Sequence, residues 1–240
     1  MMPFASKRFK CTLGARGSGG GFTLLEVLLA IFFFSIIITT LFGAYTAVLD
    51  KAQSVENNLV FNDMAQVCLN RMIIDLKSAY VALPPLYKQP AFDSQPDPYR
   101  IVTVPSETGE DRFMTLRFTS QAHIALDRQF RSGVAEIVYY VQARNDGQFV
   151  LRRSDRLFFD EPFEPQPGDP ILCENVKHLT FRFVDYEGED HDNWDSETDD
   201  FDYATPRGIT IKLEIGTPSS TFTYETRINL PVYREKVGKI

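Results

Sequence analysis

The sequence contains few of the side chains that carry out catalysis or hold metal ions. Its 240 residues include three cysteines, three histidines and one tryptophan. The histidines, at positions 123, 178 and 191, are scattered, and no HExxH, phosphate-binding loop or Ser/His/Asp order follows a suitable element. No two cysteines form a CxxC pair, so a metal or redox site of that type is not indicated. We therefore predict that the protein is not an enzyme and needs no cofactor.

Basic residues are outnumbered by acidic ones. The net charge of −7 argues against nucleic acid as a partner. Of the cysteines, Cys11 lies in a basic N-terminal segment, whereas Cys68 and Cys173 lie further along the chain. An oxidising cell envelope would permit a disulfide between the last two. The plainer alternative is two buried free thiols, because Cys68 falls within a helical pattern and free cysteine packs as a small hydrophobe. The sequence leaves both alternatives open.

Charge is almost absent from the segment between Phe22 and Ala44, where Glu26 is the one charged residue. As a helix this segment is roughly 35 Å long, enough for a bilayer core of about 30 Å. It is longer than the apolar core of about 7–15 residues in an ordinary secretory signal. We predict a membrane anchor. A carboxylate in such a segment costs about 2.5–3.5 kcal/mol, which favours a functional role for Glu26.

The residues before the anchor are basic and glycine-rich. They include Lys7, Arg8, Lys10 and Arg16 and no acid. Positive flanks stay on the cytoplasmic side, so the C-terminal part of the chain is predicted to face the other side of the membrane.

The run Gly21-Phe22-Thr23-Leu24-Leu25-Glu26 resembles the class III signal of type IV prepilins and type II secretion prepseudopilins. The resemblance implies that a membrane aspartyl prepilin peptidase removes residues 1–21 by cutting after Gly21 and then methylates the new N-terminus, Phe22. It also implies that Glu26 pairs with the N-terminal ammonium of a neighbouring subunit during assembly. Two plainer readings are an uncleaved anchor, and a Glu26 favoured in the first helical turn by the macrodipole.

A helix is predicted to continue past the membrane, over residues 45–83. Residues 47–80 contain neither proline nor glycine, and Pro84-Pro85 is expected to end the helix. An apolar face recurs at helical spacing, which indicates packing against a core. Its members are Ala65, Leu69, Met72, Ile73, Leu76 and Tyr80.

The period changes to two in the region 84–240, where about seven strands are predicted. Asn145-Asp146-Gly147 and Gly216 to Ser220 are hairpin turn signals. The fold class is therefore α+β and pilin-like, with a long N-terminal membrane-spanning helix packed on a C-terminal antiparallel β domain. The predicted strands are residues 100–104, 113–119, 134–142, 148–153, 179–183, 209–215 and 222–230.

In the size of its β domain and in the presence of Glu26, the chain resembles the J-type minor pseudopilin of type II secretion (general secretion pathway protein J, GspJ). Residues 69–76 look like that class's arginine/acid-leucine helix end. Residues 138–141 and 151–153 look like its central hairpin.

The resemblance implies a structural subunit of the inner membrane, with a single span and a periplasmic domain, at or near the tip of the pseudopilus. It implies a role in fibre initiation and protein export. The implied partners are the I-, K- and H-type minor pseudopilins, the major pseudopilin and the prepilin peptidase. A type IV pilus minor pilin, and an envelope enzyme or receptor anchored by a pilin-like helix, are the alternatives.

An acidic segment lies between Asp185 and Asp202, with ten acids in eighteen residues. It is not an EF-hand, because the required glycine is missing. We expect a solvated loop between strands. The alternative is a calcium site with Asp190, Asp192 and Asp195 as candidate ligands. No other metal ligand is predicted.

Overall fold

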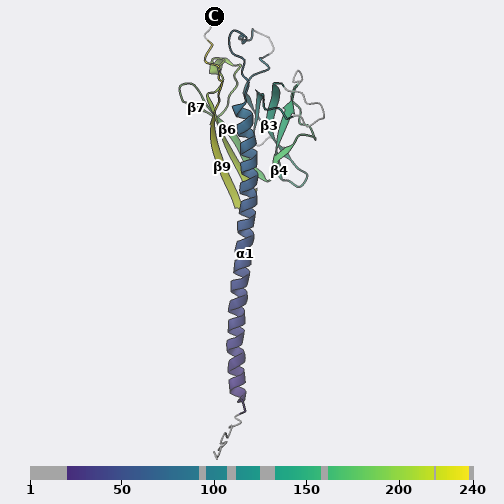
Figure 1. Cartoon of the computed structure of the whole chain (residues 1–240), viewed down its shortest axis with the longest axis vertical. Coiled ribbons are helices and arrows are strands. Elements are labelled where there is room, and N and C mark those ends of the chain that lie inside the picture. Colours follow the sequence, from purple (N-terminus) through teal and green to yellow (C-terminus); the bar gives the residue numbers. More distant parts are fainter. Residues whose placement is uncertain are drawn as a thin grey trace, which may run out of the picture. The chain divides into compact units, whose positions relative to one another are not determined.

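The computed structural model describes residues 21–91, 96–106, 112–124, 133–157, 162–218 and 220–237. Residues 1–20 of the predicted leader 1–21, with Cys11, lie outside the described residues. One long helix is followed by two antiparallel sheets (Figure 1), which confirms the predicted α+β pilin-like class. The chain divides into two compact units, one ending at Val55 and the other beginning at Glu56.

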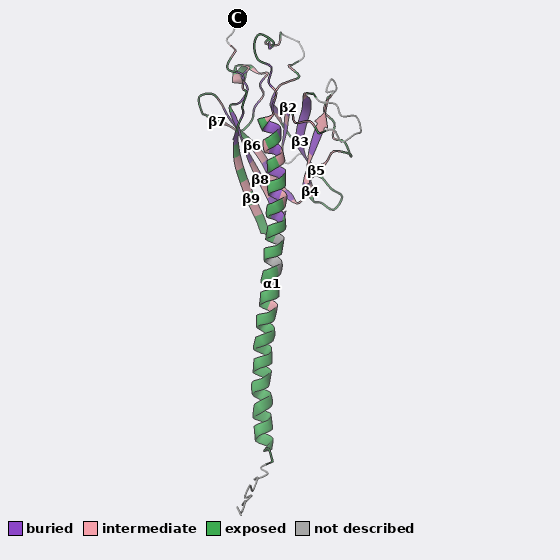
Figure 2. Ribbon diagram, in the orientation of Figure 1, coloured by how far each residue is buried: buried purple, intermediate pink, exposed green. Residues whose placement is uncertain are grey.

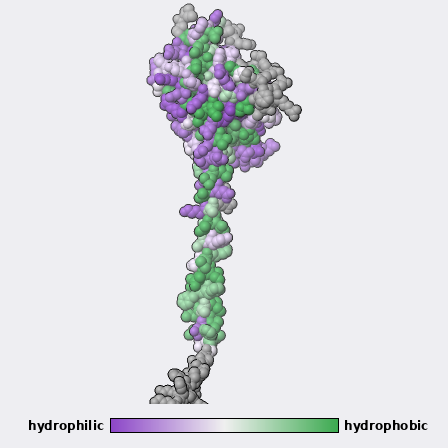
Figure 3. Space-filling model, viewed as in Figure 1, coloured by the Kyte–Doolittle hydropathy of each residue, from purple (hydrophilic) through white to green (hydrophobic). Residues whose placement is uncertain are grey.

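Helix α1 (Leu24–Lys77) begins with an exposed apolar stretch. Leu24–Leu49 is long and apolar enough to cross a membrane, with a mean hydropathy of 2.5. Figure 3 shows hydrophobic side chains along this part of α1. The hydroxyls of Ser35, Thr39 and Thr40 donate to carbonyls of the preceding turn at 2.7–2.8 Å, so these polar groups are satisfied within the helix.

The C-terminal part of α1 buries one face, which Figure 2 shows as a change from exposed to buried residues within the second unit. The predicted core residues Ala65, Leu69, Met72 and Leu76 are buried, whereas Ile73 and Tyr80 are half-buried. The helix ends at Lys77, before the expected stop at Pro84-Pro85. The reason is tertiary: Tyr80 N donates to Thr119 O at 2.9 Å, so the chain leaves the helix to pair with the end of strand β2.

The first sheet has five antiparallel strands in the order β1-β2-β3-β4-β5. Strands β3 and β4 form a regular hairpin around Asp146-Gly147, as the turn signal predicts, and Gly147 takes a φ of 77°. The bounds are β1 (Val102–Pro105), β2 (Met114–Ser120), β3 (Ala135–Ala143), β4 (Phe149–Arg156) and β5 (Ile171–Cys173).

The second sheet has the order β7-β6-β8-β9. Its longest pairing, β8 with β9, runs from Gly208 opposite Asn229 to Thr217 opposite Ser220. A short 3-10 helix, η1 (Asp199–Phe201), lies between β7 and β8. The strand bounds are β6 (Val176–Val184), β7 (Asp190–His191), β8 (Gly208–Thr217) and β9 (Ser220–Asn229).

The two sheets and the C-terminal part of α1 share one hydrophobic core. The sheets also touch directly, because Leu179 N of β6 donates to Arg112 O at 3.0 Å beside the start of β2. Each of the seven predicted strands is present. The structure adds β5 and β7, which have three and two residues and are too short to carry a detectable alternation.

Candidate functional site

The N-terminal candidate site is a helix start. Gly21, Phe22 and Thr23 precede α1, and Thr23 caps it: its hydroxyl accepts from Glu26 N at 3.2 Å. Thr23 O also accepts from the backbone N of Glu26 and of Val27. Thr-x-x-Glu has the residue order of a capping box, so these residue types fix where the helix begins. The Gly21–Phe22 bond therefore lies outside the helix, in a segment that a peptidase can bind in extended form.

Steric crowding does not explain the glycine at position 21. A Cβ added there would meet no atom within 4 Å. The fold of the chain therefore does not require a glycine at this position.

Glu26 lies in an apolar environment on the surface of α1. Its side chain lines a shallow groove in which the other members are apolar: Phe22, Val27, Ala30, Ile31 and Phe34. An unpaired carboxylate among such side chains favours a cationic partner once the surface leaves water. The site residues Gly21, Phe22 and Glu26 are thus adjacent along one helix start, as their sequence positions require.

A buried charge cluster, here called the Asp75 cluster, links α1 to the first sheet. The carboxylate of Asp75 is fully buried and accepts hydrogen bonds from Arg153, at 2.7 Å and 3.2 Å, and from Arg71 and Tyr139. Ser120 Oγ donates to the backbone carbonyl of Asp75 at 2.8 Å. Each part of the group is satisfied, as a buried carboxylate must be if it is to stay charged.

Two residues extend the Asp75 cluster. Arg153 Nη1 lies 2.6 Å from Asp155 Oδ2, and His123 Nδ1 lies 2.5 Å from Asp155 Oδ1. Burial lowers the pKa of Arg153, but the carboxylates of Asp75 and Asp155 outweigh it and hold that pKa above its ordinary value. Burial and the neighbouring Asp75 also raise the pKa of the Tyr139 phenol. The cluster is therefore a buried structural joint between α1 and the first sheet.

Sequence reasoning missed the Asp75 cluster, although a signal was present. Asp75 follows Met72 by three residues and precedes Leu76, so it falls on the apolar face of α1. An acid on a face that is otherwise buried requires a basic partner. The partner, Arg153, could not be found from spacing because it lies in another element.

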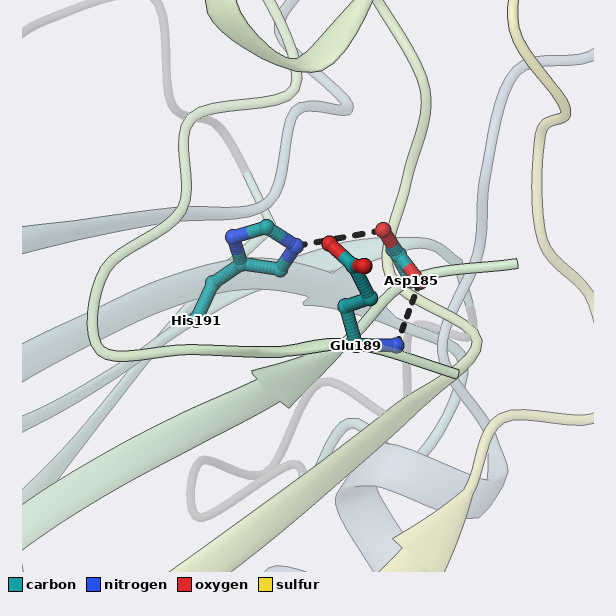
Figure 4. Close-up of side chains that lie close together, drawn as sticks. All are labelled: Asp185, Glu189 and His191. Atoms are coloured by element: carbon teal, nitrogen blue, oxygen red, sulfur yellow. Dashed lines mark hydrogen bonds and ion pairs between the residues drawn. The ribbon is translucent and has the colours of Figure 1, made fainter. Parts of the chain in front are cut away.

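The acidic segment holds a group that could bind a metal ion, but with different members from those predicted. Ligand atoms of Asp185, Glu189 and His191 all lie within 4.8 Å of one another (Figure 4). His191 Nε2 lies 3.2 Å from Asp185 Oδ2, and Glu189 N donates to Asp185 Oδ1 at 2.8 Å. Burial raises the pKa of Asp185, but these contacts outweigh it and hold that pKa below its ordinary value.

The predicted ligands Asp190, Asp192 and Asp195 are not in this group. Asp190 is exposed on β7, and the almost fully exposed side chain of Asp192 faces Arg182 at 3.6 Å. Asp195 Oδ2 lies 3.8 Å from Arg100 Nη1. The calcium assignment of these three residues stays a prediction.

The expectation of a solvated loop is wrong for the middle of the acidic segment. Trp194 is 2% exposed, stacks on Phe201 with ring centroids 4.2 Å apart, and donates through Nε1 to Ala204 O at 3.1 Å. His191 meets the edges of both rings. The charged side chains therefore surround an aromatic core that pattern reasoning could not detect.

Arg234, near the C-terminus, bonds to the acidic segment and to the residue after it. Its side chain is 1% exposed, Nη2 lies 2.7 Å from Glu197 Oε1, and Nε donates to Tyr203 O at 2.7 Å. Its guanidinium also lies 3.3 Å from the ring centroid of Tyr87. Burial raises the pKa of Glu197, and Arg234 offsets only part of that effect. No sequence pattern singled out Arg234, because all of its partners are distant in the chain.

More than half of the chain matches a known family. The family model described as type II secretion system (T2SS), protein J covers residues 43–219. This range begins after Gly21, Phe22 and Glu26, so the match does not depend on the processing signal. No curated protein matches the chain.

Proposed function

Because this chain belongs to the type II secretion system protein J family and is thus a minor pseudopilin, we propose that it sits at or near the tip of a periplasmic pseudopilus. There it aids fibre initiation and protein export. The family is a structural component of the secretion system and not an enzyme family, and an inner-membrane protein with one span fits both the family and the apolar stretch of α1. The family match favours this function over a type IV pilus minor pilin.

Cleavage and methylation at the N-terminus are the next part of the proposal. The prepilin peptidase cuts after Gly21 on the cytoplasmic side and methylates Phe22, and the rest of the chain faces the periplasm. The exposed non-helical Gly21–Phe22 bond supports this proposal. Glu26 then pairs with the ammonium of a neighbouring subunit's N-terminus, which supplies the cation that its apolar groove lacks.

The observation that carries the assembly proposal is an exposed apolar stripe on the packed part of α1. Val60, Val67 and Ile74 are 56%, 62% and 51% exposed, although their helix is otherwise anchored in the core. They recur every seven residues, which is the spacing of a seam between two helices. We assign this stripe to a helix of another pseudopilin, of the I, K, H or major type.

Glu26→Ala tests the assembly proposal. The variant should insert into the membrane, because removing a charge lowers the cost of insertion. It should recruit partner pseudopilins poorly and reduce secretion when it replaces the native chain at native expression. Glu56→Ala is the control, because Glu56 is exposed on the same helix beyond the apolar stretch. Normal secretion by Glu26→Ala would contradict the proposed role.

The stripe has its own test. Val60→Ser, Val67→Ser and Ile74→Ser together should leave the domain folded, since all three side chains are exposed, yet weaken co-purification with the I- and K-type partners. Leu86→Ser removes an apolar side chain that is even more exposed but lies outside α1, and it should have no effect. Unchanged co-purification of the triple variant would assign the partner interface elsewhere.

A further inference from the structure

Residues 173–176 carry the chain from one sheet to the other. Strand β5 ends at Cys173 and β6 begins at Val176, so the two residues between them form the crossover. Asn175 takes a left-handed φ of 56°, and its carbonyl accepts from Gly216 N at 3.0 Å. The crossover is therefore fixed to the second sheet on one side and to the first sheet through β5 on the other.

The crossover also lies against α1. Glu174 N is 3.2 Å from Met64 Sδ, and Cys68 follows Met64 by four residues, on the same side of the helix. Cys68 and Cys173 belong to the same buried core cluster, and interaction with the Cys173 side chain raises the pKa of the Cys68 thiol. Both thiols are buried, at 0% and 1% exposure, and both are reduced in the structure. Two cysteines far apart in sequence thus meet where α1 and both sheets converge.

We propose that Cys68 and Cys173 are a disulfide-forming pair that covalently joins α1 to the crossover between the two sheets. The proposal rests on the proposed periplasmic location, because that compartment is oxidising. The two thiols lose two protons and two electrons as the S–S bond forms. A thiol–disulfide oxidoreductase accepts the electrons: its own disulfide breaks, passes through a mixed disulfide with one cysteine, and ends as two thiols.

The bond forms before the domain closes. The interaction with the Cys173 side chain and burial both raise the pKa of Cys68, so the folded reduced pair holds little of the reactive thiolate. An oxidant therefore meets these thiols only in the unfolded or opening chain. Once formed, the disulfide is sealed from reductants by the same burial.

The linkage closes a long loop, from position 68 to position 173. A disulfide across a loop of about 100 residues restricts the unfolded chain strongly, which corresponds to a rise in melting temperature on the order of 10 °C for a domain of this size.

Mass spectrometry of the full chain tests the pair directly. The protein is made in cells that export it, its free thiols are alkylated at harvest, and it is digested with trypsin without reduction. We expect a linked peptide that joins residues 52–71 to residues 157–177, which are the tryptic peptides of Cys68 and Cys173. Cys68→Ser must abolish the linked peptide, whereas Cys11→Ser must leave it unchanged.

A second experiment separates the pair from the location. The reduced chain is unfolded in urea and returned to detergent with oxidised and reduced glutathione, and refolding is followed by the fluorescence of the buried Trp194. The 68–173 linkage should dominate over any linkage to Cys11, and reduction should lower the melting temperature to that of Cys68→Ser. A refolded chain without this linkage would overturn the pair. A second outcome is possible: the disulfide forms during refolding with glutathione, but both thiols are found alkylated in protein from exporting cells. That result would show that the disulfide does not form in the periplasm and would count against that location.

Discussion

Arg153 on β4 donates two hydrogen bonds to the carboxylate of Asp75 on α1, with Nε 2.7 Å from Oδ2. The pair joins the last turns of the helix to the central hairpin of the first sheet. These are the two segments outside the N-terminus whose sequences resemble protein J. Their resemblance thus has a physical basis, because each segment supplies one half of a buried ion pair that sets how the sheet sits on the helix.

Asp75→Asn should destabilise the folded chain by about 3–5 kcal/mol, because the half-buried Arg71 loses the carboxylate it pairs with and the buried Arg153 keeps only Asp155. Urea unfolding in detergent, followed by Trp194 fluorescence, measures the change. Asp63→Asn is the matched control, since Asp63 is exposed on the same helix. A loss below about 1 kcal/mol would show that the pair contributes little to stability.

A bulky residue at position 21 should stop processing. Gly21→Leu leaves the fold unaffected, because the position is open, but it changes the residue that the peptidase must accept. Intact mass measurement of the membrane protein should find a chain that begins at N-methylated Phe22 for the wild type and an uncut precursor for Gly21→Leu. Detection of residue 1 in wild-type protein from cells with active prepilin peptidase would refute the assignment.

Alkaline pH should destabilise the chain. Burial raises the pKa of Tyr87, Tyr139 and Tyr140 above the ordinary value of 10.0. The unfolded chain releases these protons first, so the stabilisation is complete below pH 10 and is lost as pH rises toward the folded-state values. Urea midpoints measured by circular dichroism between pH 8 and 11 should fall above pH 10. Tyr139→Phe should make the urea midpoint fall less steeply with pH. If the steepness is unchanged, Tyr139 does not contribute to the pH dependence.

Substitutions in the acidic segment should separate its core from its surface. Trp194→Ala should cost about 3–5 kcal/mol, because it empties the centre of an aromatic cluster. Asp190→Asn combined with Asp192→Asn should be nearly neutral, because both side chains are exposed. Deletion of residues 187–200 removes Trp194 and should unfold the domain, although a solvated loop would tolerate it. Thermal melts of the three variants decide between these outcomes.

A chelator should leave the melting temperature unchanged. Asp185 and His191 already satisfy each other, so the group with Glu189 needs no metal to hold its geometry. Melting curves with calcium and with a chelator provide the measurement. If the chelator lowers the melting temperature, Glu189→Gln should remove that difference, and the acidic segment would then be a metal site.

The sequence predicted the order of elements better than the contacts between them. Periodicity located each long strand and the apolar face of α1, because alternation and helical spacing are local properties. It missed the end of α1, since Lys77 is the last residue only because Tyr80 bonds to β2. Arg234 and Trp194 could not be predicted either. The partners of Arg234 lie 29 to 152 residues away, and Trp194 packs in an aromatic cluster that has no periodic pattern.

The placement of Arg234 determines the order in which the chain can fold during export. In the proposed orientation the N-terminus stays cytoplasmic, so the part of α1 that follows the membrane span emerges before either sheet, with its apolar face uncovered. The second sheet is complete only after β9 arrives, and the contacts of Arg234 to Ala82 and Glu197 form only when residue 234 has emerged. The domain therefore closes only after residue 234 has emerged, and the uncovered helix must be kept from wrong partners until then.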